Sequence, residues 1–215
     1  MSLDQKLKRR LAQALGVVDE QTGVKGPRLL DDAQRLWGRV QKLVAMHLVA
    51  DPDLDALELA CYSLLLPMRQ PKPPTAGKMG RTNLKDRTEQ AAELLVTLLE
   101  DDADEELLDR GTRILHEAPH KSPVVEDAKL LADAVNLDDF GVVGMVLQTI
   151  QLTRQGDGIT QLAEGAEKRE QYGYWEARLK DGFHFEPIRQ MAKQRVEHAR
   201  EVARLLLEEL KEDQP

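Results

Sequence analysis

The sequence predicts an all-α protein, and three observations support this. Leu, Ala, Glu, Lys, Arg and Gln dominate the 215 residues, and aromatic residues make up only 4%. Runs of β-branched or aromatic residues, which favour strands, are few. Residues 187–211 carry one apolar stripe at helical spacing. A chain of this length suits a single domain and buries roughly 70% of the surface that its unfolded form exposes, so its core needs no disulfide or structural metal.

The first half of the chain divides into five expected helices. They cover residues 4–15, 31–50, 54–66, 86–99 and a segment that starts in the acidic run 100–106 and ends near residue 117. Asp31 and Asp32 supply capping carboxylates for the second helix, and Pro67 ends the third, which is apolar enough to be buried on most sides. Residues 69–80 hold three prolines and two glycines, which predicts a loop.

Four helices are expected in the second half, after a turn bounded by Pro119 and Pro123. They cover residues 126–135, a segment capped by Asp138 or Asp139 and ending near residue 152, residues 160–180 with a break near Gly173, and residues 187–211. Pro187 suits the first turn of the last helix, because proline lacks the N–H that this turn leaves unpaired. The apolar stripe of the last helix contains Ile188, Met191, Val196, Ala199, Val202, Ala203, Leu206 and Leu210.

Charge and cysteine content exclude several classes of protein. The formal net charge is −8, which gives no general affinity for nucleic acid or for acidic membrane surfaces, so neither is an expected partner. Cys61 is the only cysteine, so no intramolecular disulfide can form, and its apolar surroundings predict a small core residue. We expect no signal peptide and find no apolar stretch of about 18 residues, so a cytoplasmic location is the default expectation.

Familiar catalytic motifs are absent from the sequence, which has no P-loop, GxGxxG turn, CxxC pair, GxSxG elbow or HExxH pair. His116 and His120 are four residues apart, a spacing that places two metal ligands on one helical face. Pro119 lies between them, however, so we expect the helix to end before His120, which favours a surface turn over a pair of metal ligands.

Three aspartates gather at a predicted junction between helices, namely Asp133, Asp138 and Asp139. A cluster of carboxylates can bind a hard cation or act in acid–base chemistry. Aspartates at such junctions also cap helices, so both interpretations stay open.

Two segments resemble the HD-domain phosphohydrolase superfamily. Residues 126–144, EDAKLLADAVNLDDFGVVG, are similar to the segment that closes the metal site there, a helix followed by Asp-Ala-Asp-x-Leu-Asp and Gly-x-x-Gly. Residues 174–210 are similar to the C-terminal end of one bacterial branch, in which an Ala-x-x-Arg pattern, here Ala192 and Arg195, precedes a long last helix. The resemblance implies a compact multi-helix HD-domain-like bundle that forms one domain over residues 1–215.

Within that bundle, residues 4–16 are a candidate appendage.

Members of the superfamily resemble one another through a His on one helix, a His-Asp pair that ends a second helix, and a distal Asp. In the superfamily these residues hold one or two divalent metals, which activate water for attack on a phosphoester. The residues of this chain at the matching positions can therefore be compared with the metal ligands of the superfamily.

The resemblance places apolar side chains at every one of those ligand positions. The matching residues are Leu36, Leu66, Pro67 and Val135. These side chains cannot coordinate a cation. Burying a Leu or Val stabilises a fold by roughly 1.5–3 kcal/mol, whereas a buried carboxylate without its metal costs energy. Apolar replacement therefore favours a refilled core, and no catalytic residue, metal or other cofactor is expected.

Three hypotheses about function follow from the resemblance. In the first, a catalytically degenerate HD-domain-like protein binds an unknown small ligand or protein. Its residual pocket is expected near His116, His120, Lys121, Asp133, Asp138 and Arg195. In the second, an active phosphohydrolase acts on nucleotides or other phosphoesters. Its divalent metal would be held by the displaced ligands His116, His120, Asp133 and Asp138.

The third hypothesis is a structural, homo-oligomeric protein. The last helix and an aromatic cluster would then form a homodimer surface. The cluster consists of Tyr172, Tyr174, Trp175, Phe183 and Phe185. Core packing explains both features equally well, so the sequence leaves the choice open.

Overall fold

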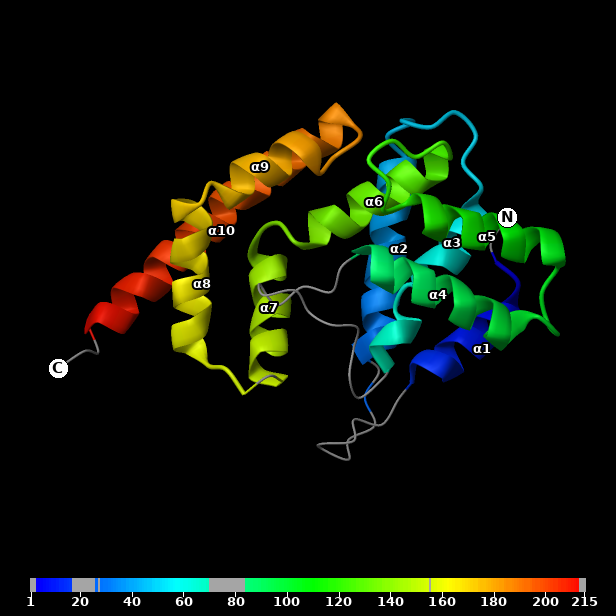
Figure 1. Cartoon of the computed structure of the whole chain (residues 1–215), viewed down its shortest axis with the longest axis horizontal. Helices are drawn as coiled ribbons and strands as arrows, with labels where there is room; N and C mark the ends of the chain where they lie inside the picture. The colour runs from blue at the N-terminus through cyan, green and yellow to red at the C-terminus, as the bar shows by residue number, and fades with distance from the viewer. Residues whose placement is uncertain (1–2, 17–25, 27, 70–83, 155, 213–215) are drawn as a thin grey trace. The chain divides into compact units, whose positions relative to one another are not determined.

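The computed structural model describes residues 3–16, 26, 28–69, 84–154 and 156–212. These residues form ten α-helices and one 3-10 helix and contain no β-strand, which confirms the all-α prediction (Figure 1). The helices are α1 Gln5–Leu15, α2 Arg28–Val44, α3 Leu54–Ser63, η1 Leu66–Arg69, α4 Leu84–Leu99, α5 Glu105–Glu117, α6 Glu126–Asp138, α7 Val142–Arg154, α8 Ile159–Gln171, α9 Tyr174–Asp181 and α10 Glu186–Glu212. The predicted loop over residues 69–80 lies, apart from Arg69, outside the described residues.

Contacts between helices divide the described chain into two units. The first unit contains the described residues up to Ala134, which include α1 to α5, η1 and most of α6. The second unit contains those from Val135 onward, which include the end of α6 and α7 to α10. The organisation of residues 1–215 as one domain stays a prediction.

Helix α3 is the centre of the first unit. All of its residues from Ala56 to Ser63 are buried, which confirms the prediction of a helix buried on most sides. Helices α2, α4 and α5 pack against it. Helix α5 comes close because Gly111 has no side chain, since a Cβ there would lie 2.9 Å from Cδ2 of Leu59. Cys61 is fully buried in α3 as predicted, and burial raises the pKa of its thiol, which keeps it unreactive.

Helix α1 joins the first unit through an apolar stripe and a buried ion pair. It contacts α2, α4 and η1, so the candidate appendage packs into this unit. Its buried residues are Leu7, Leu11, Ala14 and Leu15. Nζ of Lys8 lies 2.8 Å from Oε1 of Glu58, which is 2% exposed on α3. The backbone N–H of Leu3 donates to Oε2 of the same carboxylate at 3.3 Å, so this buried charge is paired and hydrogen-bonded.

Aspartate side chains begin three helices of the first unit. They are Asp4 before α1, Asp53 before α3 and Asp104 before α5. Each accepts a hydrogen bond from a backbone N–H of the first turn, which satisfies a donor that helix geometry leaves unpaired. The prediction that the acidic run 100–106 starts a helix in its second half is confirmed.

The start of α2 differs from the prediction. The helix begins at Arg28, so the expected caps Asp31 and Asp32 lie inside it and the prediction that they cap it is wrong. Arg35 Nη2 donates to Oδ1 of Asp32 at 3.1 Å, and Nη1 of Arg28 lies 4.0 Å from its Oδ2. These pairs are three and four residues apart, a spacing that stabilises helix on both sides of Asp32.

Two helix ends in the first unit also fall earlier than predicted. Helix α2 ends at Val44 rather than Ala50, and His47 takes a φ of 55°, a left-handed conformation that does not continue a right-handed helix. Helix α3 ends at Ser63, and the chain then tightens into η1. Pro67 lies inside this 3-10 helix rather than at the end of α3.

In the second unit, α7, α8 and α9 all contact α10, and α8 also contacts α7 and α9 (Figure 1). Helices α8 and α9 are separated at Gly173, which has a φ of 59°, as predicted. The buried residues of α10 are Ile188, Ala192, Val196 and Ala199. Beyond Ala199 the apolar residues of α10 are half-buried or exposed. None of the described helices, α10 included, is long and apolar enough to cross a membrane.

Aromatic residues form part of the core of the second unit. The ring of Phe140 lies 5.3 Å from that of Trp175 and 5.2 Å from that of Phe183, centroid to centroid. Trp175 and Phe183 are buried, whereas Tyr172 is 72% exposed. Packing within the unit therefore accounts for two members of the predicted aromatic cluster, and the homodimer surface stays a prediction.

The corner between α6 and α7 corrects another predicted cap. Asp138 is the last residue of α6, and Gly141 directly precedes α7, so neither Asp138 nor Asp139 stands at the predicted cap position. Asp139 instead accepts a hydrogen bond from Nη2 of Arg178 at 3.2 Å. Gly141 has a φ of 86°, and a Cβ there would lie 3.1 Å from Cβ of Arg195 on α10. The corner needs glycine for both its conformation and its close packing.

Replacing Lys8 by Met is expected to destabilise the protein by about 2 kcal/mol, because it keeps the aliphatic packing but leaves the buried Glu58 carboxylate without its cation. Lys6→Met is the matched control, since Lys6 is exposed and pairs with Asp102 at the surface, where a pair contributes at most about 1 kcal/mol. Urea unfolding measures both losses. Equal losses would contradict the anchoring role of the Lys8–Glu58 pair.

Candidate functional site

The positions that the resemblance matches to metal ligands carry apolar side chains that are buried or half-buried. Leu36 belongs to the buried stripe of α2 and is 3% exposed. Leu66 and Pro67 lie in η1 and are both buried. Val135 lies near the end of α6 and is half-buried. None of these side chains offers a donor atom to a cation, so each contributes packing instead.

His116, His120 and Lys121 lie exposed around the turn after α5. Helix α5 ends at Glu117, which confirms that the helix stops before His120. The carboxylate of Glu117 accepts the backbone N–H of Val124 at 2.8 Å and lies 3.6 Å from Nδ1 of His120. The Val124 hydrogen bond, followed by the His120 charge, holds the pKa of Glu117 below its ordinary value. Glu117 thus holds the turn after α5 through contacts with His120 and Val124.

Asp133, Asp138 and Arg195 occupy three different environments. Asp133 is fully buried on α6 in the first unit, and Asp138 is half-buried in the second. Nη1 of Arg195 donates to the carbonyl of Leu137 at 3.0 Å, and so satisfies an acceptor at the end of α6. Ala192, which precedes Arg195 in the family pattern, is fully buried on α10.

A further group of carboxylates lies at the starts of α3 and α6. Oδ2 of Asp53 accepts from Nε of Arg110 at 2.6 Å, and the backbone N–H of Asp53 donates to Oδ2 of Asp127 at 3.1 Å. Burial, followed by the charges of Asp53, Asp51 and Glu126, raises the pKa of Asp127. Across the described residues, no three His, Cys, Asp or Glu side chains converge closely enough to hold a metal ion.

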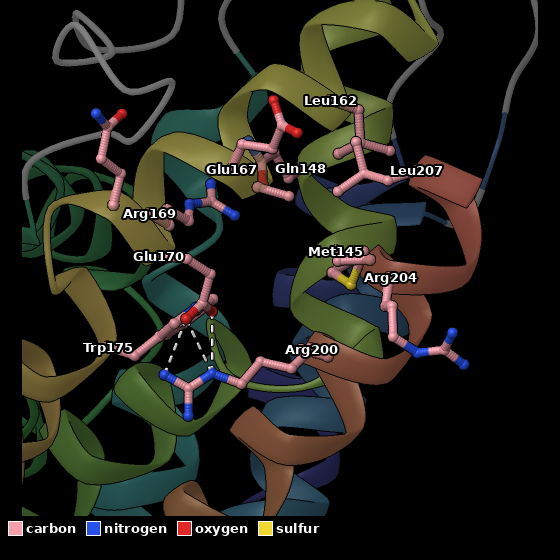
Figure 2. Close-up of a pocket in the computed structure, with 14 residues that line it drawn as sticks. Met145, Gln148, Leu162, Glu167, Arg169, Glu170, Trp175, Arg200, Arg204 and Leu207 are labelled. Atoms are coloured by element: carbon pink, nitrogen blue, oxygen red, sulfur yellow. Dashed lines mark hydrogen bonds and ion pairs between the residues drawn. The ribbon is translucent and has the colours of Figure 1, made fainter. Parts of the chain in front are cut away.

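The second unit contains a cavity of about 660 Å³ (Figure 2). Helices α7, α8, α9 and α10 all contribute to its wall. Its apolar lining includes Met145, Leu162, Trp175, Ala199, Ala203 and Leu207. Small-molecule sites have volumes in this range and are mostly apolar, with a few polar groups that fix the orientation of the ligand. The cavity is therefore a candidate ligand site.

Arg200 ties together the helices around this cavity. Its Nε lies 3.0 Å from both carboxylate oxygens of Glu170 on α8, and Figure 2 shows the two side chains turned toward each other. Its Nη2 donates to Glu176 on α9 at 2.7 Å, and its Nη1 donates to Glu197 on α10 itself at 3.0 Å. The hydrogen bond from Arg200 lowers the pKa of Glu176. One guanidinium thus joins three helices.

Sequence reasoning missed this cavity and expected a pocket elsewhere. A signal for it exists in the spacing of Ala199, Ala203 and Leu207, which are four residues apart and so share one face of α10. Ala199 and Ala203 belong to the predicted apolar stripe, but the stripe predicts only that they pack against neighbouring helices. Their small side chains leave the hollow that larger residues would fill.

The all-helical fold is similar to that of an HD-domain protein, as the sequence predicts. A similar solved structure is that of Bacillus subtilis YpgQ, an HD-domain protein, in complex with ADP. The two chains are 18% identical, the match covers 98% of this chain and 96% of that chain, and the TM-score is 0.60. No family model and no curated protein matches the sequence. The likeness to YpgQ establishes the fold.

The raised pKa of Asp127 predicts a pH-dependent stability. Because the folded protein binds this proton more tightly than the unfolded chain, the stability contributed by Asp127 falls as pH rises from about 4 through the raised folded pKa. The free energy of unfolding of the native protein, relative to an Asp127→Asn variant, should therefore decline over that window. Urea unfolding across the pH range measures the difference, and a flat difference would exclude a raised pKa.

Substitution at Leu36 tests whether this position is packed hydrocarbon. Leu36→Met keeps volume and apolarity and should cost less than about 1.5 kcal/mol. Leu36→Asn buries an amide without an assured partner and should cost about 3 kcal/mol or more. The midpoints of urea unfolding report both costs. A small cost for both variants would show that Leu36 faces a solvated pocket, and would contradict a core refilled with apolar side chains.

Proposed function

We propose that this protein is a metal-free HD-domain-like protein that acts by binding a small ligand or a protein partner and does not hydrolyse phosphoesters. The observation that carries this proposal is the burial of Leu36 and Leu66, which are 3% and 2% exposed. On the resemblance, both stand where the superfamily has metal-binding histidines. An alkyl side chain in such a position has no lone pair and fills the space that a metal and its water would need.

Two further observations support the proposal. The described residues hold no group of three potential ligand side chains close enough for a metal ion. His116 and His120 are the histidines nearest to a ligand spacing. His116 lies exposed in the last turn of α5, and His120 lies exposed in the turn that follows, where Glu117 already interacts with it. A catalytic metal site requires convergent ligands in a cavity that restricts water, and this turn supplies neither.

The alternative is an active phosphohydrolase with displaced ligands, which would use a divalent metal. The complex of YpgQ with ADP favours a nucleotide as the ligand in this alternative. It would draw on His116, His120, Asp133 and Asp138. Asp133 is fully buried, whereas His116 and His120 are exposed, and this difference in environment disfavours the alternative.

Metal analysis combined with a hydrolysis assay separates the two functions. We expect protein produced with Mn and Fe supplied, and then desalted gently, to contain no stoichiometric transition metal. We also expect it to release no phosphate from ADP or other nucleotides with Mn or Mg added. Bound metal together with hydrolysis would overturn the proposal. The exposed His116 can be replaced by Ala with little effect on folding, so loss of hydrolysis in that variant would identify a displaced ligand.

A further inference from the structure

The cavity of the second unit has charged groups of both signs in its wall, but they differ in availability. Three arginines line it, namely Arg169, Arg200 and Arg204. Two glutamates, Glu167 and Glu170, line it as well. Which of these groups can receive a ligand depends on which of them already have partners.

The guanidinium groups of Arg200 and Arg204 already have carboxylate partners. Arg200 makes the hydrogen bonds to Glu170, Glu176 and Glu197 described above. Nε of Arg204 donates to Glu201 at 3.1 Å, and its Nη1 donates to Glu208 at 2.6 Å.

The third guanidinium is stacked on the aromatic wall. Cζ of Arg169 lies 5.6 Å from the ring centre of Tyr174 and 5.7 Å from that of Trp175, within the range of a cation–π contact. An anionic ligand at this cavity would therefore have to compete with carboxylates or rings that are already in place.

Acceptor groups in the same wall are unpaired. Glu167 is exposed and has no ion pair or hydrogen bond with any described residue. Oε1 of Gln148 is buried and has no hydrogen-bond donor among the described residues. A buried acceptor without a donor costs free energy, so a ligand that donates a hydrogen bond to it relieves that cost.

The charges of the lining favour a cation once the partners of the arginines are considered. The lining itself holds three arginines and two glutamates. Four glutamates outside the lining, namely Glu176, Glu197, Glu201 and Glu208, accept hydrogen bonds from Arg200 and Arg204 and so offset their positive charge. Glu167 is the lining carboxylate without such a partner among the described residues, and its negative charge attracts a cation.

We propose that this cavity binds a small organic cation with an apolar body, of the class of aryl or alkyl amines. The body occupies the apolar hollow lined by Met145, Leu162 and Trp175, and the ammonium group lies at Glu167 with the Gln148 amide as a further acceptor. This inference rests on the ligand-binding function proposed above and specifies its ligand class. It places the ligand in the cavity of the second unit, whose lining contains none of the residues that the resemblance matches to metal ligands.

Three probes with the same body test the inference, namely phenylbutylamine, phenylbutanol and phenylbutyrate. The Trp37→Phe variant leaves Trp175 as the single tryptophan, so its fluorescence reports occupancy of the cavity. At neutral pH we expect a saturable change with the amine, weaker binding of the alcohol and the weakest binding of the carboxylate. Tighter binding of the carboxylate than of the amine, or no saturable change with any probe, would overturn the inference.

Charge variants locate the ammonium group. In the Trp37→Phe background, Glu167→Gln should weaken binding of the amine by about fivefold, the magnitude of one solvent-exposed ion pair, and leave binding of the alcohol unchanged. Glu93→Gln, an exposed glutamate of α4, is the matched control and should change neither. An unchanged affinity for the amine in Glu167→Gln refutes the assignment. This result is independent of metal content and hydrolysis, which decide the proposed function.

Discussion

The burial of α3 on every side is the constraint on which the first unit depends. Helices α2, α4 and α5 must all approach it, and α5 does so only because Gly111 presents no side chain to Leu59. The same burial isolates Glu58 from water, so its charge has to be paired from within the protein. Lys8 on α1 supplies the cation, and this pairing helps to make the first helix part of the core.

The second unit is held together by different forces. Phe140, Trp175 and Phe183 form a small aromatic core. Beside the apolar cavity, Arg200 joins α8, α9 and α10 through polar contacts. Small side chains on one face of α10 leave the hollow. The two units thus differ, because the first buries Leu36, Leu66 and Pro67, three of the four positions that the resemblance matches to metal ligands, and the second contains the cavity.

Periodicity and composition were enough to predict the all-α class, most helices, the break at Gly173 and the buried Cys61, because these depend on local sequence and on burial. The start of α2 was not predictable from caps alone, since the pairs of Asp32 with Arg28 and Arg35 extend the helix past its expected cap. The cavity was missed because a hollow depends on what neighbouring helices fail to fill, which no single segment encodes. The expected pocket residues His116, His120 and Lys121 were placed by analogy, and they lie exposed at the end of α5 and in the turn after it.

The pairs around Arg200 make the contacts among α8, α9 and α10 sensitive to ionic strength. Glu170 and Glu176 are 45% and 63% exposed in their side chains, so mobile ions screen their attraction to Arg200. The attraction between Lys8 and Glu58 is screened less, because the Glu58 side chain is only 3% exposed. Added salt therefore weakens the ties between the helices that enclose the cavity more than the tie that joins α1 to α3.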